Sequence, residues 1–146
     1  MAGQGGQGSP GDDGPTGRRG RRLISSGGPW ESVAGYSRAV VVGDDCWVAG
    51  TTDAGPDGRS LNPGDPVSQA RETFGRIDEA LAQGGFGRAD IVRIRIFVTD
   101  MRSAPRLTAL MGELFGSIRP AATLVGVAEL IEPSLMVEIE ADARRT

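Results

Sequence analysis

The chain of 146 residues contains no histidine and no lysine, and it has a single cysteine, Cys46. Without histidine, Ser-His-Asp and Cys-His catalysis, imidazole zinc ligation and imidazole proton shuttles are excluded. Without lysine, a side-chain Schiff base and a P-loop lysine are excluded. One cysteine cannot form an intrachain disulfide or a multi-thiolate metal site. Any chemistry must therefore come from Asp, Glu, Arg, Tyr, Ser, Thr, Cys46, backbone amides or water, and we expect neither a metal nor a cofactor.

Long apolar runs are also missing, since no stretch approaches the roughly 18 consecutive apolar residues of a membrane span. The composition is 38% hydrophobic and 24% charged with a net charge of -3, which is ordinary for a globular protein. The length fits one domain. A lone cysteine favours a reducing compartment, and the N-terminal segment lacks the apolar centre of a signal peptide. We therefore expect a cytoplasmic protein that does not contact a membrane.

Residues 1–22 are rich in Gly, Pro and polar residues and contain no large aliphatic or aromatic residue after Met1. Such a segment cannot bury a core, so we expect a disordered tail over 1–22 and one domain over 23–146. Arginines at positions 18, 19, 21 and 22 could touch nucleic acid, but no aromatic residue or recognition motif accompanies them. Beyond residue 22, twelve arginines face seventeen Asp and Glu residues, which opposes binding to a phosphate backbone.

Turn signals divide the domain into seven elements. Strand-prone segments at 37–42 and 46–49 flank Gly43-Asp44-Asp45 and predict a hairpin. After a long loop over 50–65, Asp65-Pro66 supplies an N-cap and a first-turn proline for a long amphipathic helix that ends at Gly84-Gly85. A strand over 91–98, a helix capped by Ser103 and ended by Gly116, and strands over 121–127 and 135–141 follow.

The predicted order is β-β-α-β-α-β-β, an α+β domain in which two helices cover one face of a mixed sheet. The other face is unusual in its side chains. In the last strand, apolar residues alternate with Met136, Glu138, Glu140 and Asp142, which should point away from the helices. In the strand over 91–98 we expect Val92, Ile94, Ile96 and Val98 on one face and Arg93, Arg95 and Phe97 on the other. A face that mixes apolar residues with Arg and Glu predicts burial by another subunit.

The local sequences resemble the Rid family, also called YjgF/YER057c, whose members are imine and enamine deaminases and their non-deaminating relatives. The matching segments are SSGGPWESVAGYSRAVVVGDDCWVAGTT at 25–52, DIVRIRIFVTD at 90–100, IRPAATLVGV at 118–127 and LMVEIEADA at 135–143. They occur in the family's order and span nearly the whole domain. The resemblance implies a chorismate-mutase-like homotrimer, with the sheets facing inward and a small-molecule cleft at each subunit interface.

The resemblance also assigns site residues, and the chain departs from the family at two of them. Catalytic members hold the substrate carboxylate with an arginine where this chain has Ala122, and Leu124 stands where a cysteine usually follows. Glu138 keeps the position of the glutamate that orients or activates the hydrolytic water. Tyr36 keeps the pocket tyrosine, and Thr108 stands at a polar helix position.

Each candidate has a structural alternative. Glu138 could serve catalysis, or it could pair with an arginine in a trimer interface. Arg95 lies on the same predicted face and could replace the missing anchor, although a pair with Glu138 or Glu140 is the favoured alternative. Tyr36 fits a core or interface aromatic equally well, and Cys46 fits a small buried residue. Trp30 is a candidate for lining the cleft because nothing periodic surrounds it.

Two functions stay open at this point. The first is a Rid-type hydrolase acting on a small imine or enamine, on a substrate without a carboxylate or at a lower rate unless Arg95 compensates for Ala122. The second is a non-enzymatic trimer with a retired site that binds a metabolite or a partner protein. An RNA-directed role is a third and weaker possibility, which only the basic tail supports.

Overall fold

The structure is a computed structural model, and it describes residues 20–146. Most of the predicted tail lies outside this range. The described elements are β1 (Arg21–Ile24), α1 (Trp30–Ala34), β2 (Ala39–Val42), β3 (Asp45–Thr51), α2 (Pro66–Gln83), the 3-10 turn η1 (Arg88–Asp90), β4 (Ile91–Val98), the 3-10 turn η2 (Met101–Ser103), α3 (Ala104–Phe115), β5 (Ala121–Gly126) and β6 (Val137–Arg144).

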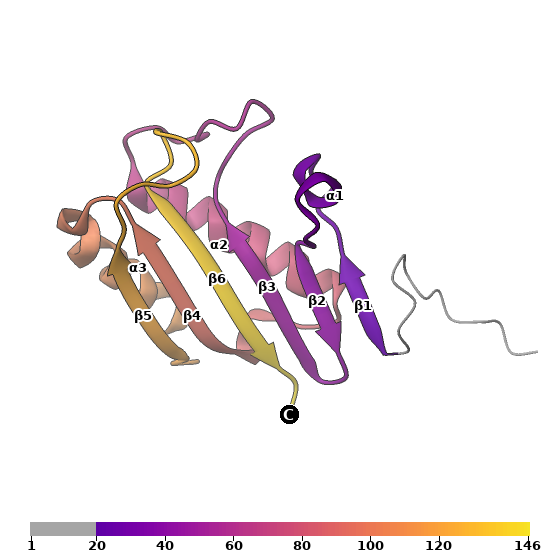
Figure 1. Cartoon of the computed structure of the whole chain (residues 1–146). Coiled ribbons are helices and arrows are strands. Elements are labelled where there is room, and N and C mark those ends of the chain that lie inside the picture. Colours follow the sequence, from indigo (N-terminus) through magenta and orange to yellow (C-terminus); the bar gives the residue numbers. More distant parts are fainter. Residues whose placement is uncertain (1–19) are drawn as a thin grey trace, which may run out of the picture.

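The strands form one six-stranded sheet in the order β1-β2-β3-β6-β4-β5. All neighbours are antiparallel except β4 and β5, which are parallel, so the sheet is mixed. Helices α2 and α3 cover one face of the sheet, and neither of them lies over the other face (Figure 1). The predicted α+β fold class and the placement of both helices on one face are confirmed.

Two elements were missing from the predicted order. Strand β1 begins at Arg21, so Arg21 and Arg22 belong to the sheet rather than to a tail that ends at residue 22. They pair with Val42 and Val41 of β2, because an edge strand accepts long charged side chains that keep their ends in water. The short helix α1 was also missed, since five residues are too few to show a helical period.

The predicted hairpin is present as β2 and β3. Val42 pairs with Asp45, so the connection is the two-residue turn Gly43-Asp44. Gly43 has a φ of 58°, and this left-handed conformation favours glycine in tight hairpin turns.

Helix α2 begins and ends as predicted. The Asp65 side chain accepts a hydrogen bond from the Ser68 amide at 3.0 Å, and Pro66 occupies the first turn. Gly84 ends the helix, and Gly85 follows with a φ of 79°. Ala70, Phe74, Ile77 and Leu81 form its buried stripe against the sheet.

The start of α3 differs from the prediction. Ser103 does not cap the helix with its side chain. Because η2 leads directly into α3, Ser103 already has a helical conformation, with φ -78° and ψ -11°. Its Oγ instead donates to the Asp100 carbonyl at 2.7 Å, and the Asp100 side chain accepts from the Arg102 amide. The capping side chain therefore lies three residues earlier than expected, at Asp100, where the 3-10 turn begins.

Strand β4 corrects one predicted side-chain direction. A bulge against β6 falls between Ile91 and Arg93, so Val92 is an extra residue on that strand. Val92 is 48% exposed instead of lying in the core. From Arg93 onward the predicted alternation holds, with Ile94, Ile96 and Val98 buried.

The side chain of Gln69 joins two loops at one end of the sheet. It is fully buried on α2. Its Nε2 donates to the carbonyls of Asn62 and Ser134 at 3.2 and 3.0 Å, and its Oε1 accepts from the Met136 amide at 2.8 Å. One amide group therefore satisfies the backbone of the loop before α2 and of the loop before β6.

We predict that Gln69→Leu lowers the free energy of unfolding by about 3 kcal/mol, because it leaves buried backbone groups without partners. Urea denaturation followed by circular dichroism measures the loss. Gln83→Leu on the exposed end of α2 is the matched control and should change stability by less than about 0.5 kcal/mol. Equal effects of the two substitutions would contradict this role for Gln69.

Candidate functional site

Strand β6 places three carboxylates on the open face of the sheet. Glu138, Glu140 and Asp142 are half-buried there, and they alternate with the buried Val137, Ile139 and Ala141. Their cross-strand neighbours on β4 are Phe97, Arg95 and Arg93, respectively. The predicted face of convergent Arg and Glu residues is therefore present in the chain.

Glu138 lies against a β-bulge. The register of β3 with β6 shifts between Val48 and Thr51, and Gly50 lies within this irregular stretch. A Cβ atom on Gly50 would collide with Oε1 of Glu138. Glycine at position 50 therefore provides the space that the carboxylate occupies.

The environment of Glu138 changes its acidity. Burial raises the pKa of its carboxyl above the ordinary value, the Arg38 guanidinium opposes this rise, and the negative charge of Glu140 adds to it. A half-buried carboxylate with a raised pKa can exchange protons more readily near neutral pH than an exposed one. This is the behaviour expected of a general base or a water-orienting group.

Arg38 was not among the residues predicted from the sequence. Its Nη1 donates to the Gly50 carbonyl and to Thr51 Oγ1, both at 2.7 Å. Its guanidinium carbon lies 5.6 Å from the centre of the Tyr36 ring. A signal was available, since Tyr36 and Arg38 are two residues apart where the hairpin begins and so fall on the same side of an extended chain.

Arg95 is engaged by other carboxylates. Its Nη1 lies 3.1 Å from Glu140 Oε1 and 3.7 Å from Asp142 Oδ2. No ion pair joins it to Glu138 within residues 20–146. Two roles were considered for Arg95, a substitute anchor and an ion pair with Glu138 or Glu140. Within the described chain, Arg95 forms the ion pair with Glu140.

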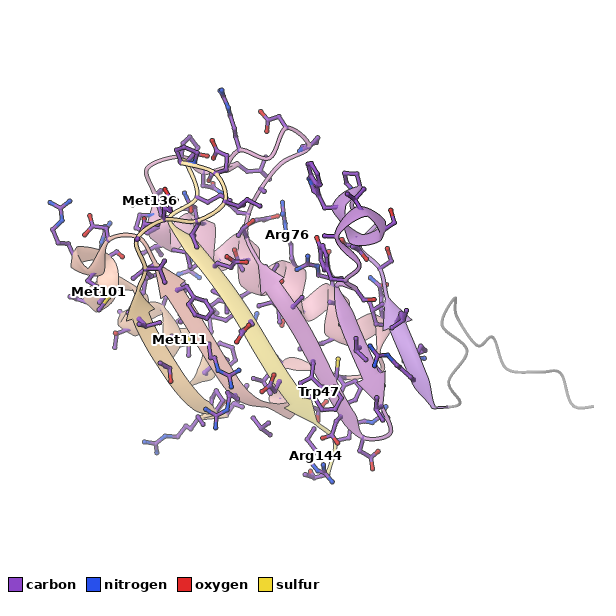
Figure 2. The ribbon with its side chains drawn as sticks, in the orientation of Figure 1. Trp47, Arg76, Met101, Met111, Met136 and Arg144 are labelled. Atoms are coloured by element: carbon purple, nitrogen blue, oxygen red, sulfur yellow. The ribbon has the colours of Figure 1, made fainter. Side chains whose placement is uncertain are left out.

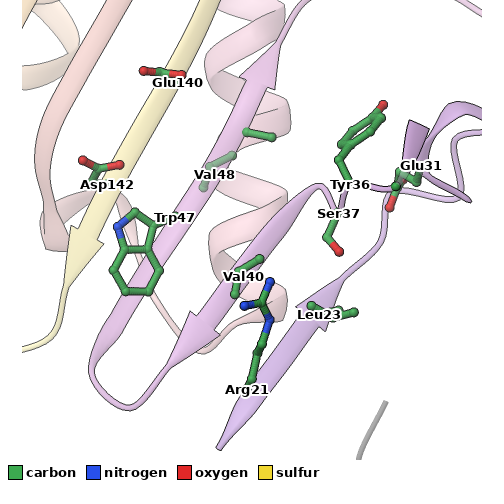
Figure 3. Close-up of a pocket in the computed structure, with 12 residues that line it drawn as sticks. Arg21, Leu23, Glu31, Tyr36, Ser37, Val40, Trp47, Val48, Glu140 and Asp142 are labelled. Carbon is green, nitrogen blue, oxygen red and sulfur yellow. The ribbon is translucent and has the colours of Figure 1, made fainter. Parts of the chain in front are cut away.

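Two hollows mark the open face. The larger, of about 650 Å³, runs over β1–β3 from Arg21 to Tyr36 and Glu31, with Trp47, Glu140 and Asp142 along its side (Figure 3). The smaller, of about 390 Å³, is bounded by Gly50, Phe97, Val127, Glu129, Leu130, Glu138 and Glu140. Glu140 borders both, so the hollows are neighbours along β6.

Trp30 belongs to α1 and is 67% exposed, outside the walls of both hollows. The next residue, Glu31, fixes α1 to the preceding loop. Its carboxylate accepts hydrogen bonds from the Ser26 amide and hydroxyl and from the Gly28 amide. Burial acts to raise the pKa of Glu31, but these hydrogen bonds outweigh it and lower the pKa.

The other predicted site residues lie on the opposite side of the sheet. Ala122 and Leu124 of β5 pair with Ile94 and Ile96 of β4, so they share the side that the helices cover. Thr108 is exposed on α3, one of those helices. A single chain therefore cannot bring Ala122, Leu124 and Thr108 into one pocket with Glu138 and Tyr36.

Strand β5 lies at the end of the sheet and pairs on one side only. Its sequence, Ala121–Gly126, carries no charge, and five of its six residues are exposed. Uncharged edge strands of this kind are normally covered by another element or another chain.

Three observations concern the metal-ligating residues, the cysteine and the helices of the described part of the chain. Within residues 20–146, no group of three or more His, Cys, Asp or Glu side chains is arranged to hold a metal ion. Cys46 is fully buried, and burial raises the pKa of its thiol despite the charges of Arg22 and Arg145. Over the same residues, no helix combines the length and apolarity that crossing a bilayer requires.

Comparison with known proteins gives consistent matches over this fold. The model of the family described as Endoribonuclease L-PSP matches residues 29–145. The uncharacterized protein SCO2049 of Streptomyces coelicolor is 37% identical over 124 residues, which cover 85% of this chain and 92% of that protein. The 2-iminobutanoate/2-iminopropanoate deaminase of Dermatophagoides farinae is 29% identical over 119 residues, covering 82% of this chain and 92% of the relative.

Solved structures agree with these matches. Rv2704 of Mycobacterium tuberculosis, described as a member of the YjgF/YER057c/UK114 family, superposes with a TM-score of 0.77 at 44% identity, over 86% of this chain and 99% of that one. The YjgF gene product of E. coli superposes with a TM-score of 0.73 at 26% identity over the same shares of the two chains. The chain therefore belongs to the Endoribonuclease L-PSP family of YjgF/YER057c/UK114 proteins, the Rid family.

Proposed function

We propose that the chain is an imine or enamine hydrolase, with Glu138 as the catalytic residue and a homotrimer as the working form. The observation that carries the proposal is the position of Glu138, whose half-buried carboxylate lies over Gly50 at the wall of a hollow. The relative named 2-iminobutanoate/2-iminopropanoate deaminase supports the reaction class.

The reaction needs one water molecule and one proton relay. Glu138 accepts a proton from water as the water oxygen bonds to the carbon of the C=N group. The nitrogen takes that proton from Glu138, which gives the carbinolamine. Glu138 then carries the hydroxyl proton of the carbinolamine to the nitrogen, the C–N bond breaks, and the carbonyl compound and ammonia leave. Water and imine are consumed, ketone and ammonia are formed, and Glu138 returns as a carboxylate.

The trimer would complete the site. Glu138, Tyr36 and Arg95 lie on the open face, whereas Thr108, Ala122 and Leu124 lie on the helix side at the β5 edge. In a ring of three copies, the β5 edge of one subunit can meet the open face of the next. The small-molecule cleft then has walls from two subunits, and the uncharged edge of β5 is covered.

The substrate is expected to differ from that of the familiar family members. Ala122 has no guanidinium to offer a substrate carboxylate, and losing a buried charged contact of this kind costs about 2–5 kcal/mol of binding. The enzyme would therefore act on a non-standard imine of a specialised pathway, or it would hold the substrate carboxylate with another arginine.

The absence of a guanidinium at position 122 also favours a second candidate function. A retired deaminase site would keep the fold, the trimer and the cleft while losing the anchor. The protein would then bind a small metabolite in the cleft, or a partner protein on its surface, without turnover.

The family description also names an endoribonuclease. The acidic balance of the chain beyond residue 22 opposes affinity for an RNA backbone. The open face also disfavours RNA binding, because Glu138, Glu140 and Asp142 line it. We therefore keep the prediction that the partner is a small molecule rather than a nucleic acid, and that the protein works in the cytoplasm.

We predict that the wild-type protein accelerates ammonia release from a panel of short-lived imines formed in situ by an amino-acid oxidase, and that Glu138→Gln reduces this by about 100-fold or more. Glu79→Gln, an identical change on the exposed side of α2, is the control and should leave the rate unchanged. Light scattering should give the same oligomer mass for wild type and Glu138→Gln. Full activity of Glu138→Gln would contradict the catalytic assignment, and a smaller species would indicate an interface role for Glu138 instead.

The raised pKa of Glu138 predicts the pH dependence. The working form is the carboxylate, so kcat/KM should fall as the pH drops through this pKa, at a higher pH than for an ordinary glutamate. Glu140→Gln removes a negative neighbour that raises the pKa, so the acid limb should move to lower pH. An acid limb that stays in place or moves to higher pH in Glu140→Gln would contradict this assignment.

A further inference from the structure

The smaller hollow of the open face has a lining that is acidic and apolar. Three carboxylates line it, together with an aromatic and an aliphatic side chain: Glu129, Glu138, Glu140, Phe97 and Leu130. No arginine of the described chain is among its lining residues. Its volume of about 390 Å³ is that of a small-molecule site. The lining therefore favours a ligand that is partly apolar and is not an anion.

Two of the three carboxylates have no partner in direct contact. The side chains of Glu129 and Glu138 form no hydrogen bond and no ion pair within residues 20–146. Glu140, in contrast, accepts a hydrogen bond from Arg95 Nη1 at 3.1 Å. The Arg38 guanidinium reaches Glu138 only through its charge, since it donates to the Gly50 carbonyl and to Thr51. Negative charge is therefore in excess at the hollow.

The carboxylates also act on one another. Glu138 and Glu140 lie on the same face of β6, about 7 Å apart along the strand. Burial raises the pKa of Glu138, the Arg38 charge opposes this rise, and the negative charge of Glu140 adds to it. A positive charge in the hollow would oppose this repulsion and stabilise the carboxylate form of Glu138.

The facing wall of the proposed trimer brings no positive charge to the cleft from its strand. That wall would come from β5 of a neighbouring copy, and Ala121–Gly126 is uncharged. Ala122 stands in this strand at the place of the arginine that holds a substrate carboxylate in catalytic relatives. Thr108 would contribute a hydroxyl group. The excess of negative charge at Glu129 and Glu138 would therefore persist in the assembled cleft.

We propose that the ligand of the cleft is a small cationic imine, one that has no carboxylate and carries an ammonium or guanidinium group that Glu129 binds. The proposal rests on the proposed function, because it assigns the substrate class of the same site. Glu129 lies in the loop between β5 and β6, and Glu138 lies on β6, so the two carboxylates bound the hollow from different elements. The C=N carbon would lie at Glu138, with the alkyl chain of the ligand on Phe97 and Leu130.

Such a ligand would also favour the reaction. The carboxylate is the working form of Glu138 in the proposed mechanism, and a nearby positive charge lowers the pKa of a carboxyl group. A cationic substrate would therefore hold Glu138 as a carboxylate. An anionic substrate would have the opposite effect and would also be repelled by Glu129.

Ligand binding tests the proposal without requiring turnover. Three stable amides of similar length serve as probes in ligand-observed NMR titrations of the full-length protein: 4-aminobutanamide, a cation; pentanamide, which is uncharged; and succinamate, an anion. The cation should bind about tenfold more tightly than pentanamide, and succinamate should bind most weakly. Ionic strength of about 1 M should weaken binding of the cation and leave pentanamide unchanged.

Substitutions then assign the charge to Glu129, whose side chain is exposed. Glu129→Gln should weaken binding of 4-aminobutanamide by about fivefold and leave binding of pentanamide unchanged. Glu129→Lys should reverse the preference, so that succinamate binds more tightly than the cation. Glu79→Gln, on the exposed side of α2 and outside both hollows, is the matched control and should change none of the three affinities.

The outcomes separate the ligand class from the hydrolase. The proposal is overturned if pentanamide or succinamate binds as tightly as the cation, or if none of the three binds to the folded oligomer. Equal loss of the cation and of pentanamide in Glu129→Gln would also contradict it, because Glu129 would then shape the loop rather than bind charge. Selective binding of the cation by a protein that releases ammonia from no imine would support the ligand class and contradict the hydrolase.

Discussion

The close approach of the Glu138 carboxylate to Gly50 is the contact on which the site depends. The register of β3 with β6 shifts in the stretch that contains Gly50, and the absent side chain of Gly50 leaves room for Oε1 of Glu138. Arg38 holds the same bulge by its carbonyls, and Tyr36 supports Arg38. The carboxylate of Glu138 and the guanidinium of Arg38 thus both lie at one glycine. Backbone carbonyls of β3 hold the guanidinium of Arg38 in place, which favours preorganisation.

The sheet divides the remaining candidate residues between its two sides. Helices α2 and α3 occupy one side, so an open face rich in acidic residues, arginines and aromatics is left on the other (Figure 2). Because side chains alternate along β5, Ala122 and Leu124 cannot reach the open face of their own chain. The uncharged edge of β5 is exposed in a single chain, and so is the open face of the sheet. Contact with a neighbouring copy could cover both surfaces. The proposed ring of copies would cover both, and the cleft would then be a property of the assembly.

The sequence predicted the fold where local signals are strong. Asp65-Pro66, the apolar stripe of α2 and the alternation of β6 each have a direct physical cause, and each is found in the structure. The predictions went wrong where backbone geometry decides. The bulge at Val92 reverses one side chain without a sequence signal, and Asp100 replaces Ser103 as the capping residue because a 3-10 turn precedes α3. The i, i+2 spacing of Tyr36 and Arg38 was available from the sequence, but the hydrogen bonds of Arg38 to Gly50 and Thr51 depend on a second bulge that no periodicity reveals.

The proposed cleft is lined by residues of two subunits. Mixed oligomers of two different variants test this arrangement most directly. Thr108→Arg would fill the proposed helix-side wall at an exposed position, and Glu138→Gln would disable the proposed open-face wall, so each variant alone should be inactive. Refolding the two together in equal amounts should restore about a quarter of the wild-type ammonia release, because one in about four clefts then combines two intact walls. A mixture that stays as inactive as its separate components would contradict a site shared between subunits.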